Sequence, residues 1–194
     1  MLGEQGIVWL FAVMLGLYVC GTLTVFVSAG QPRAANWLSH GFSFCGGVCG
    51  VAVALLLLWQ KSTLSLSLWQ IAGGLNLSLR LDSLAAFFLL VISLLAAVVS
   101  IYATGYVSEY YDKKNVSLLG GGLNLFLLSM ALVVSVDNAF AFLLAWELMS
   151  LVSFGLVMFE HEREDVRTAG FIYVVMTHVA TLFITLSFLA LYLF

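Results

Sequence analysis

The stretch that decides the fold of this chain is Asn138–Phe159, which reads NAFAFLLAWELMSLVSFGLVMF. About 20 apolar residues are enough for a helix to cross the hydrocarbon core of a bilayer, so this stretch predicts a membrane span. Its one charged residue, Glu147, lies near its centre. A charged carboxylate at that depth costs roughly 2.5–3.5 kcal/mol on insertion scales, and acids kept there are usually functional. We therefore expect Glu147 to be a proton or ion site that needs a polar partner.

The composition of the whole chain also indicates a membrane protein. Hydrophobic residues make up 63% of it and charged residues 9%, whereas soluble domains hold about 45–50% and about 25%. The net charge of −3 gives no indication of nucleic-acid binding. Three cysteines, Cys20, Cys45 and Cys49, lie inside apolar stretches and are expected to pack as small hydrophobes. Motifs for metal, phosphate or haem binding are absent from the sequence, so we expect no cofactors.

Six stretches of suitable length predict an all-α fold, a polytopic membrane helix bundle of about six transmembrane helices. Residues 1–194 are expected to form a single transmembrane domain. The only proline, Pro32, falls in the first connection, so none of these stretches is expected to be kinked by proline. The candidate spans are Ile7–Val27, Trp37–Trp59, Asp82–Thr104, Leu118–Val136, Asn138–Phe159 and Thr168–Phe194.

The distribution of basic residues predicts the orientation of the bundle. Positive charge is enriched in cytoplasmic connections of membrane proteins. The odd-numbered connections carry most of it here, with Arg33, Lys113, Lys114, Arg163 and Arg167 against Lys61 and Arg80 on the other side. We therefore expect a multi-pass protein whose N-terminus lies outside.

The second connection, residues 60–81, has the pattern of a small external β-hairpin. Leucine alternates with polar residues in Leu64–Leu68 and again in Leu75–Leu81, and Gly73-Gly74 lies between the two runs. Period-two runs around Gly-Gly are typical of a hairpin. An isolated hairpin is marginal in water, so its leucine face should lie on helix ends or on a neighbouring subunit. The alternative is an irregular loop in which the alternation has no structural meaning.

Charged residues at the span boundaries favour structural roles. Asp82 and Arg80 can reach the headgroups or each other, and Asp137 lies where it can cap the fifth span. The fifth connection, residues 160–167, mixes acidic and basic residues. It is expected to be a solvated turn. The alternative, functional interpretation is a docking face for a soluble partner.

A partner for Glu147 is predicted on the sixth span. His178 lies as far into that span as Glu147 lies into the fifth, at about 1.5 Å per residue. The short connection makes the two spans antiparallel neighbours, so the two groups could form a proton relay. Thr177, Thr181 and Thr185 add a polar stripe beside His178.

Structural interpretations of the same residues stay open. Glu147 could be a protonated acid that is hydrogen-bonded for stability alone. His178 could be a neutral imidazole satisfied by a neighbouring hydroxyl or carbonyl. The threonine stripe, like Gly46 and Gly50 in the second span, is also typical of close packing between helices.

Several motifs resemble one family of membrane proteins. LDSLAAFF at residues 81–88, followed by YATGY at 102–106, resembles the third span of the antiporter-like subunits of respiratory complex I. That family includes cation/proton antiporter subunits and membrane subunits of formate hydrogenlyase and hydrogenase-4. WELMS at 146–150 and FIYVVMTH at 171–178 are most similar to the hydrogenase-4 branch of the family.

The resemblance implies specific roles. Glu147 matches the family's fifth-span glutamate, which takes part in proton translocation together with a lysine in a later span. His178 falls where relatives place a polar or basic residue, and Thr181 falls where some complex I subunits place an acid. The resemblance also implies a bacterial inner-membrane location. It further implies other membrane and peripheral subunits as partners, with redox chemistry carried by those subunits.

The length departs from the family pattern. Members carry many more spans, and this chain matches only the first six, so the later-span lysine has no counterpart here. We therefore expect a fragment, a split gene product or a truncated reading frame.

Three functional hypotheses follow from these observations. The leading one is the N-terminal part of a proton-translocating membrane subunit of a hydrogenase or complex I-like oxidoreductase, with Glu147 as the proton-binding acid. The first alternative is a non-translocating scaffold that anchors the hydrogenase modules. The second is a small antiporter that works as a homo-oligomer, which the missing basic partner disfavours.

Overall fold

The computed structural model describes residues 3–28, 30–71, 75–111 and 114–193. These residues form six α-helices, a two-stranded antiparallel sheet and two short 3-10 turns, which confirms the predicted all-α fold with one small hairpin. In chain order the elements are α1 (Glu4–Val27), α2 (Pro32–Gln60), β1 (Leu64–Ile71), β2 (Leu75–Leu81), α3 (Ser83–Tyr106), η1 (Val107–Tyr110), α4 (Val116–Ser135), α5 (Ala139–Val157), η2 (Met158–Glu160) and α6 (Glu164–Leu193).

Each of the six helices is long and apolar enough to cross a membrane. Lipid offers no partners for backbone N–H and C=O groups, so an apolar run of this length satisfies them internally as a helix. Four helices begin earlier than predicted, and α2 and α6 show the largest differences. Pro32 opens α2 instead of lying in the connection, because proline lacks the N–H that a first turn leaves unpaired. Glu164 and Asp165 open α6, where acidic side chains favour a helix N-terminus, so half of the predicted charged turn is helical.

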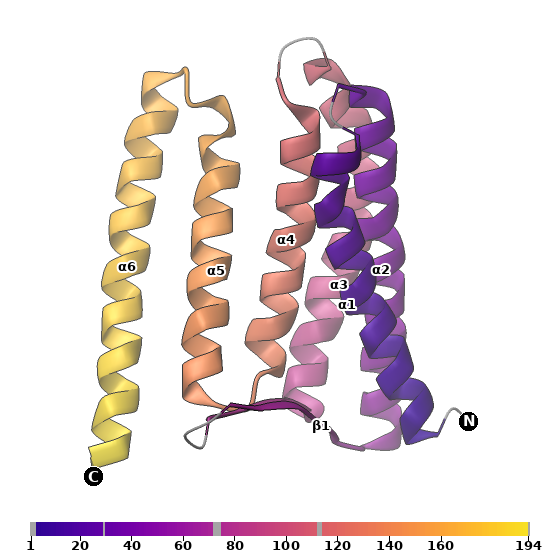
Figure 1. Cartoon of the computed structure of the whole chain (residues 1–194), viewed down its shortest axis with the longest axis vertical. Helices are drawn as coiled ribbons and strands as arrows, with labels where there is room; N and C mark the ends of the chain where they lie inside the picture. The colour runs from indigo at the N-terminus through magenta and orange to yellow at the C-terminus, as the bar shows by residue number, and fades with distance from the viewer. Residues whose placement is uncertain (1–2, 29, 72–74, 112–113, 194) are drawn as a thin grey trace.

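The helices run alternately up and down between two ends (Figure 1). The basic end holds the starts of α2, α4 and α6, with Arg33, Lys114, Arg163 and Arg167. The hairpin end holds the start of α1, the two strands and the turn between α4 and α5. The first four helices form one bundle, α5 packs on α4, and α6 packs on α5 at the far side.

The main apolar core lies in the hairpin half of the α1–α4 bundle. Its largest buried members include Ile7, Phe11 and Met14 from α1 and Leu57 from α2. Small residues allow the helices to approach closely, as the sequence predicts for Gly46 and Gly50. At Gly47, a Cβ atom would lie 2.8 Å from the backbone nitrogen of Ala97 and 2.8 Å from the backbone oxygen of Ser93. The backbones of α2 and α3 are therefore in direct contact there.

This contact predicts that Gly47→Leu destabilises the bundle. The new side chain would have to displace backbone, and overpacking of this kind costs about 1–3 kcal/mol. Gly41→Leu is the matched control, because a Cβ at Gly41 of the same helix meets nothing within 4 Å. Thermal unfolding in detergent should show a lowered Tm for Gly47→Leu and no loss for Gly41→Leu. Equal Tm values for the two variants would contradict the close approach.

The hairpin lies across the helix ends, as the leucine alternation predicts. Leu64 pairs with Leu81 and Leu66 with Leu79. Leu64, Leu79 and Leu81 are buried in the main core, so the hairpin seals that end of the bundle. The Asp137 N–H donates to the Ser78 carbonyl at 3.1 Å, which ties the turn between α4 and α5 to β2. The predicted Gly73-Gly74 turn lies outside the described residues.

Side chains cap α3 and α5, two of the three helices that start at this end. The Asp82 carboxylate accepts a hydrogen bond from the Ala85 N–H at 2.9 Å, which confirms its structural role. The α5 cap is Asn138, whose side-chain oxygen accepts from the Ala141 N–H at 2.8 Å. The predicted cap, Asp137, lies one residue before this position, and its backbone N–H is bonded to the hairpin.

Candidate proton site between α5 and α6

Glu147 lies in the middle of α5. At about 1.5 Å per residue it is roughly 12 Å from the start of the helix at Ala139 and roughly 15 Å from its end at Val157. Its side chain is 31% exposed. The carboxylate is therefore far from both helix ends, as the sequence predicts.

The structure brings His178 of α6 to this carboxylate. The His178 Nε2 atom lies 3.9 Å from the Glu147 Oε2 atom. The two helices are antiparallel neighbours, so residues equally far from the shared connection meet at one depth. The His178 side chain is 53% exposed, on the flank of the contact between α5 and α6.

The other imidazole nitrogen fixes the tautomer of His178. Its Nδ1 atom lies 2.8 Å from the Val174 carbonyl oxygen. A carbonyl only accepts hydrogen bonds, so Nδ1 carries the proton and donates it. In the neutral imidazole Nε2 is then an acceptor that faces a carboxylate oxygen, which is also an acceptor when ionised. One added proton, on either group, converts this repulsion into attraction.

The threonine stripe is bonded along its own helix. Thr177 donates to the Val174 carbonyl at 3.0 Å, Thr181 to the Thr177 carbonyl at 3.0 Å and Thr185 to the Thr181 carbonyl at 2.8 Å. The Val174 carbonyl thus accepts from both Thr177 and His178. Thr177 and Thr181 are half-buried, whereas Thr185 is exposed. The stripe therefore offers hydroxyl oxygens as acceptors, with their hydrogens already engaged.

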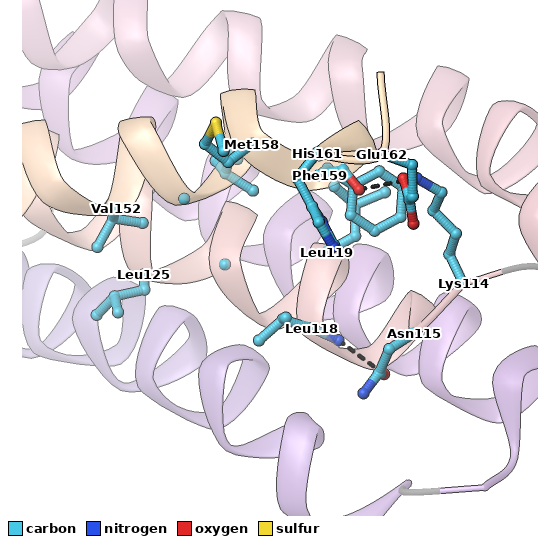
Figure 2. A pocket seen from close by; sticks show the side chains of 13 residues that line it. Lys114, Asn115, Leu118, Leu119, Leu125, Val152, Met158, Phe159, His161 and Glu162 are labelled. Atoms are coloured by element: carbon cyan, nitrogen blue, oxygen red, sulfur yellow. Dashed lines mark hydrogen bonds and ion pairs between the residues drawn. The ribbon is translucent and has the colours of Figure 1, made fainter. Parts of the chain in front are cut away.

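Two hollows open on α5 from opposite ends. The first, about 520 Å³, lies between α4 and α5 and opens at the basic end. Figure 2 shows Lys114 and Glu162 at its charged mouth, and Val152 and Leu125 at the other end of its lining. The second, about 660 Å³, is lined at the hairpin end by Arg80, Asp82 and Asp137, and it extends to Trp146. Glu147 lines neither hollow, but its position along α5 falls between Trp146 and Val152.

Ion pairs hold the mouth of the first hollow. Lys114 Nζ lies 2.6 Å from Glu162 Oε2, donates to the Phe159 carbonyl at 3.0 Å and lies 5.2 Å from the centre of the Phe159 ring. The hydrogen bond from Lys114 lowers the pKa of the Glu162 carboxyl below its ordinary value. Arg163 pairs with Glu160 and Asp165. The charges of the fifth connection are thus largely paired within the chain.

A second set of polar residues was not predicted from the sequence. His40, Asn36 and Asn124 are almost completely buried within the α1–α4 bundle. The signal was present as Asn36, Ser39, His40 and Ser43, which recur every three or four residues along the second span. This spacing was not interpreted as a site because the residues around it are apolar. Periodicity indicates that polar residues share one face of a helix, but it does not show whether that face contacts lipid or protein.

Two family models match parts of this chain. One, described as the N-terminus of chain 5 of NADH-ubiquinone oxidoreductase (complex I), matches residues 69–115. The other, described as the transmembrane region of NADH:quinone oxidoreductase and Mrp antiporters, matches residues 136–194. The second match includes both Glu147 and His178.

Individual relatives agree with these matches. Hydrogenase-4 component B of Escherichia coli K12 is 35% identical over 173 residues, which cover 89% of this chain and 25% of that protein. The NADH-quinone oxidoreductase subunit L of Mycobacterium tuberculosis H37Rv is 36% identical over 53% of this chain and 16% of its own length. The putative antiporter subunit mnhA2 of Staphylococcus aureus MRSA252 is 36% identical over 55% of this chain and 13% of its own length. The chain thus spans a quarter or less of these relatives.

Proposed function

Because this chain belongs to the family of antiporter-like membrane subunits that includes complex I and hydrogenase-4 subunits, we propose that it is the N-terminal part of a proton-translocating subunit. It would work within a hydrogenase or complex I-like oxidoreductase assembly. Glu147 would bind the transported proton, with His178 as its relay partner. Redox chemistry would take place in other subunits of that assembly.

The observation that carries this proposal is the distance of 3.9 Å between His178 Nε2 and Glu147 Oε2 in the middle of two long apolar helices. With Nδ1 engaged by the Val174 carbonyl, Nε2 is the nitrogen that can exchange a proton with the carboxylate. A carboxylate and an imidazole nitrogen at this distance can share one proton between them, which suits loading and release. Ionisable groups at such depth usually mark proton relays.

Release of the proton needs a cation that approaches the pair. A nearby positive charge favours the ionised carboxylate, so its approach would expel the proton and its withdrawal would favour rebinding. Throughout the described ranges, Lys and Arg side chains lie at helix ends or in connections. We propose that another polypeptide segment or subunit supplies the cation, as a partner of the α6 face that carries His178.

The exposure of α6 supports a partner on that face. The helix packs only on α5 and η2 among its main contacts, and large apolar side chains such as Phe171, Met176 and Phe183 stay exposed. Lipid can cover those side chains. It is a poor solvent for a half-exposed imidazole at mid-span, which favours protein or water beside His178.

The two hollows are consistent with access from both membrane faces. One extends along α5 from the basic end to Val152, and the other extends from the hairpin end to Trp146. In the proposed orientation the N-terminus lies outside a bacterial inner membrane and the basic end faces the cytoplasm. Thr181, half-buried on α6, would offer an oxygen beside the pair.

Substitutions on α6 test this proposal. His178→Leu removes the nitrogen that faces Glu147, and we expect proton uptake into inverted vesicles to fall at least about tenfold while electron transfer by the complex continues. Thr181→Val should slow uptake less, and Thr185→Val, on the exposed side of the same stripe, should leave it unchanged. Normal uptake in His178→Leu would contradict the relay. Loss of the complex on native gels would instead favour a scaffold.

A further inference from the structure

The basic half of the α1–α4 bundle has a polar interior, remote from the pair on α5 and α6. Along one face of α2, the buried residues Asn36, Ser39, His40 and Ser43 follow each other at helical spacing. His40 is 2% exposed and the other three are 0% exposed. A face of this kind inside a membrane bundle must find polar partners within the protein.

The neighbouring helices supply only part of those partners. The Asn36 amide donates to the Thr104 carbonyl at 2.8 Å and to the Tyr111 hydroxyl at 2.7 Å. From α4, the Asn124 amide donates to the Ser39 carbonyl and to the Gly120 carbonyl, both at 2.9 Å. Polar atoms from α2, α3 and α4 therefore converge around this face of α2.

Several buried atoms in the same region have no hydrogen-bond partner from the described protein atoms. They are both ring nitrogens of His40 and the side-chain oxygens of Asn36 and Asn124. A neutral imidazole needs one acceptor and one donor, and each amide oxygen needs a donor. Water supplies both, and buried polar groups without protein partners are its usual sites.

The polar interior ends partway along the bundle. Beyond Tyr18 and Ser93, the buried side chains are mainly apolar, among them Phe11, Val53 and Leu89. The buried hydroxyls of Ser129 and Ser135 in this half are bonded to carbonyls of α4 itself. Leu64, Leu79 and Leu81 of the hairpin are buried at that end of the core. Water that enters from the basic end would thus meet an apolar seal before it reached the hairpin end.

In the described part of the bundle, no buried charged side chain is available to stabilise a protonated His40. Among the residues that the structure describes, no Asp, Glu, Lys or Arg is buried. The titratable groups near this interior include the phenols of Tyr18 from α1 and Tyr111 beyond η1, and the thiol of Cys49 from α2, which interacts with Tyr18. The buried side chains of α3 and α4 contribute serines, Asn124 and apolar groups. A neutral imidazole is therefore the resting form expected here.

We propose that the α1–α4 bundle contains a water-accessible site at His40, open toward the basic end and closed toward the hairpin end. At this site the imidazole accepts a proton from water at one ring nitrogen and returns one to water from the other. The site lies in a different helix group from Glu147 and His178. Its existence does not depend on the proposed role of that pair.

Cysteine accessibility tests the proposal in the full chain in native membranes, after Cys20, Cys45 and Cys49 are replaced by Ala. Ser43→Cys places a thiol one turn deeper than His40, and Ala54→Cys places one in the apolar half, where the side chain is also 0% exposed. The probe is a small cationic methanethiosulfonate, added from either side. Ser43→Cys should react at least about tenfold faster than Ala54→Cys, and only from the basic end, because the reactive thiolate needs water.

A second substitution tests whether water access to position 43 depends on the His40 imidazole. In the Ser43→Cys background, His40→Leu should slow labelling severalfold, because an apolar side chain then replaces the ring on the route from the basic end. Ser100→Cys on α3, buried at the other side of the interior, repeats the test if Ser43→Cys does not fold. Equal labelling of the polar and apolar positions would overturn the water-accessible interior. Fast labelling that His40→Leu leaves unchanged would overturn the assignment to His40.

Discussion

Glu147→Gln should reduce proton pumping by the assembled complex at least about tenfold, which corresponds to about 1.4 kcal/mol in the barrier to transfer. Glutamine keeps the size and hydrogen-bonding capacity of the side chain but cannot bind and release a proton. The carboxylate lies 3.9 Å from His178 and is 31% exposed, so the amide fits the same space. We therefore expect assembly and electron transfer to persist in this variant.

Matched substitutions separate the proton role from a structural one. Glu160→Gln, in η2 at the basic end, removes the charge of a half-buried carboxylate that pairs with Arg163, and the glutamine oxygen can still accept the hydrogen bond from Tyr110. It should leave pumping close to normal, since exposed ion pairs are worth about 0–1 kcal/mol. Pumping that survives in Glu147→Gln would refute the role assigned to Glu147. A complex that falls apart in that variant would indicate a structural acid.

Leu81→Asp should have the largest effect on stability. Leu81 is 1% exposed in the main core, where it packs at the helix ends beneath the hairpin. An aspartate there would bury a charge without a partner, a change among the few that cost more than about 4 kcal/mol. We expect the variant to lose its thermal transition in detergent and to accumulate poorly in membranes.

The opposite face of the same hairpin provides the control. Ser65 is exposed and stands directly across from Arg80 in the strand pairing. Ser65→Asp adds the same charge to the same element but places it opposite a guanidinium, where cross-strand pairs of opposite charge are favourable. Its Tm should equal or slightly exceed that of the unsubstituted chain. Similar losses in both variants would mean that the leucine face does not seal the bundle.

Much of the fold could be predicted because lipid leaves the backbone few choices. Each apolar run of sufficient length became a helix, and the alternation of Leu64 to Leu81 became a hairpin in which Leu64, Leu79 and Leu81 are buried. The meeting of Glu147 and His178 followed from equal depth on antiparallel neighbours. These predictions depend on the length of the apolar runs and on the spacing of apolar residues, both of which can be read from the sequence.

Other features depend on packing that the sequence does not carry. Helices in lipid are apolar on most faces, so hydrophobic pattern does not tell which face meets protein. His40 therefore could not be distinguished from a lipid-facing residue until α1, α3 and α4 were in place around it. The exact start of α5, capped by Asn138 and not by Asp137, was likewise not predicted from the sequence.

The most direct test of the central claim is infrared difference spectroscopy of the working assembly, recorded between its oxidised and reduced states. If Glu147 gains and loses a proton during turnover, the spectrum should contain a carbonyl band from a protonated carboxyl group. That band should disappear in Glu147→Gln and persist in Glu160→Gln. Identical spectra from the unsubstituted protein and Glu147→Gln would show that the protonation state of Glu147 does not change, and would contradict the proposed proton translocation.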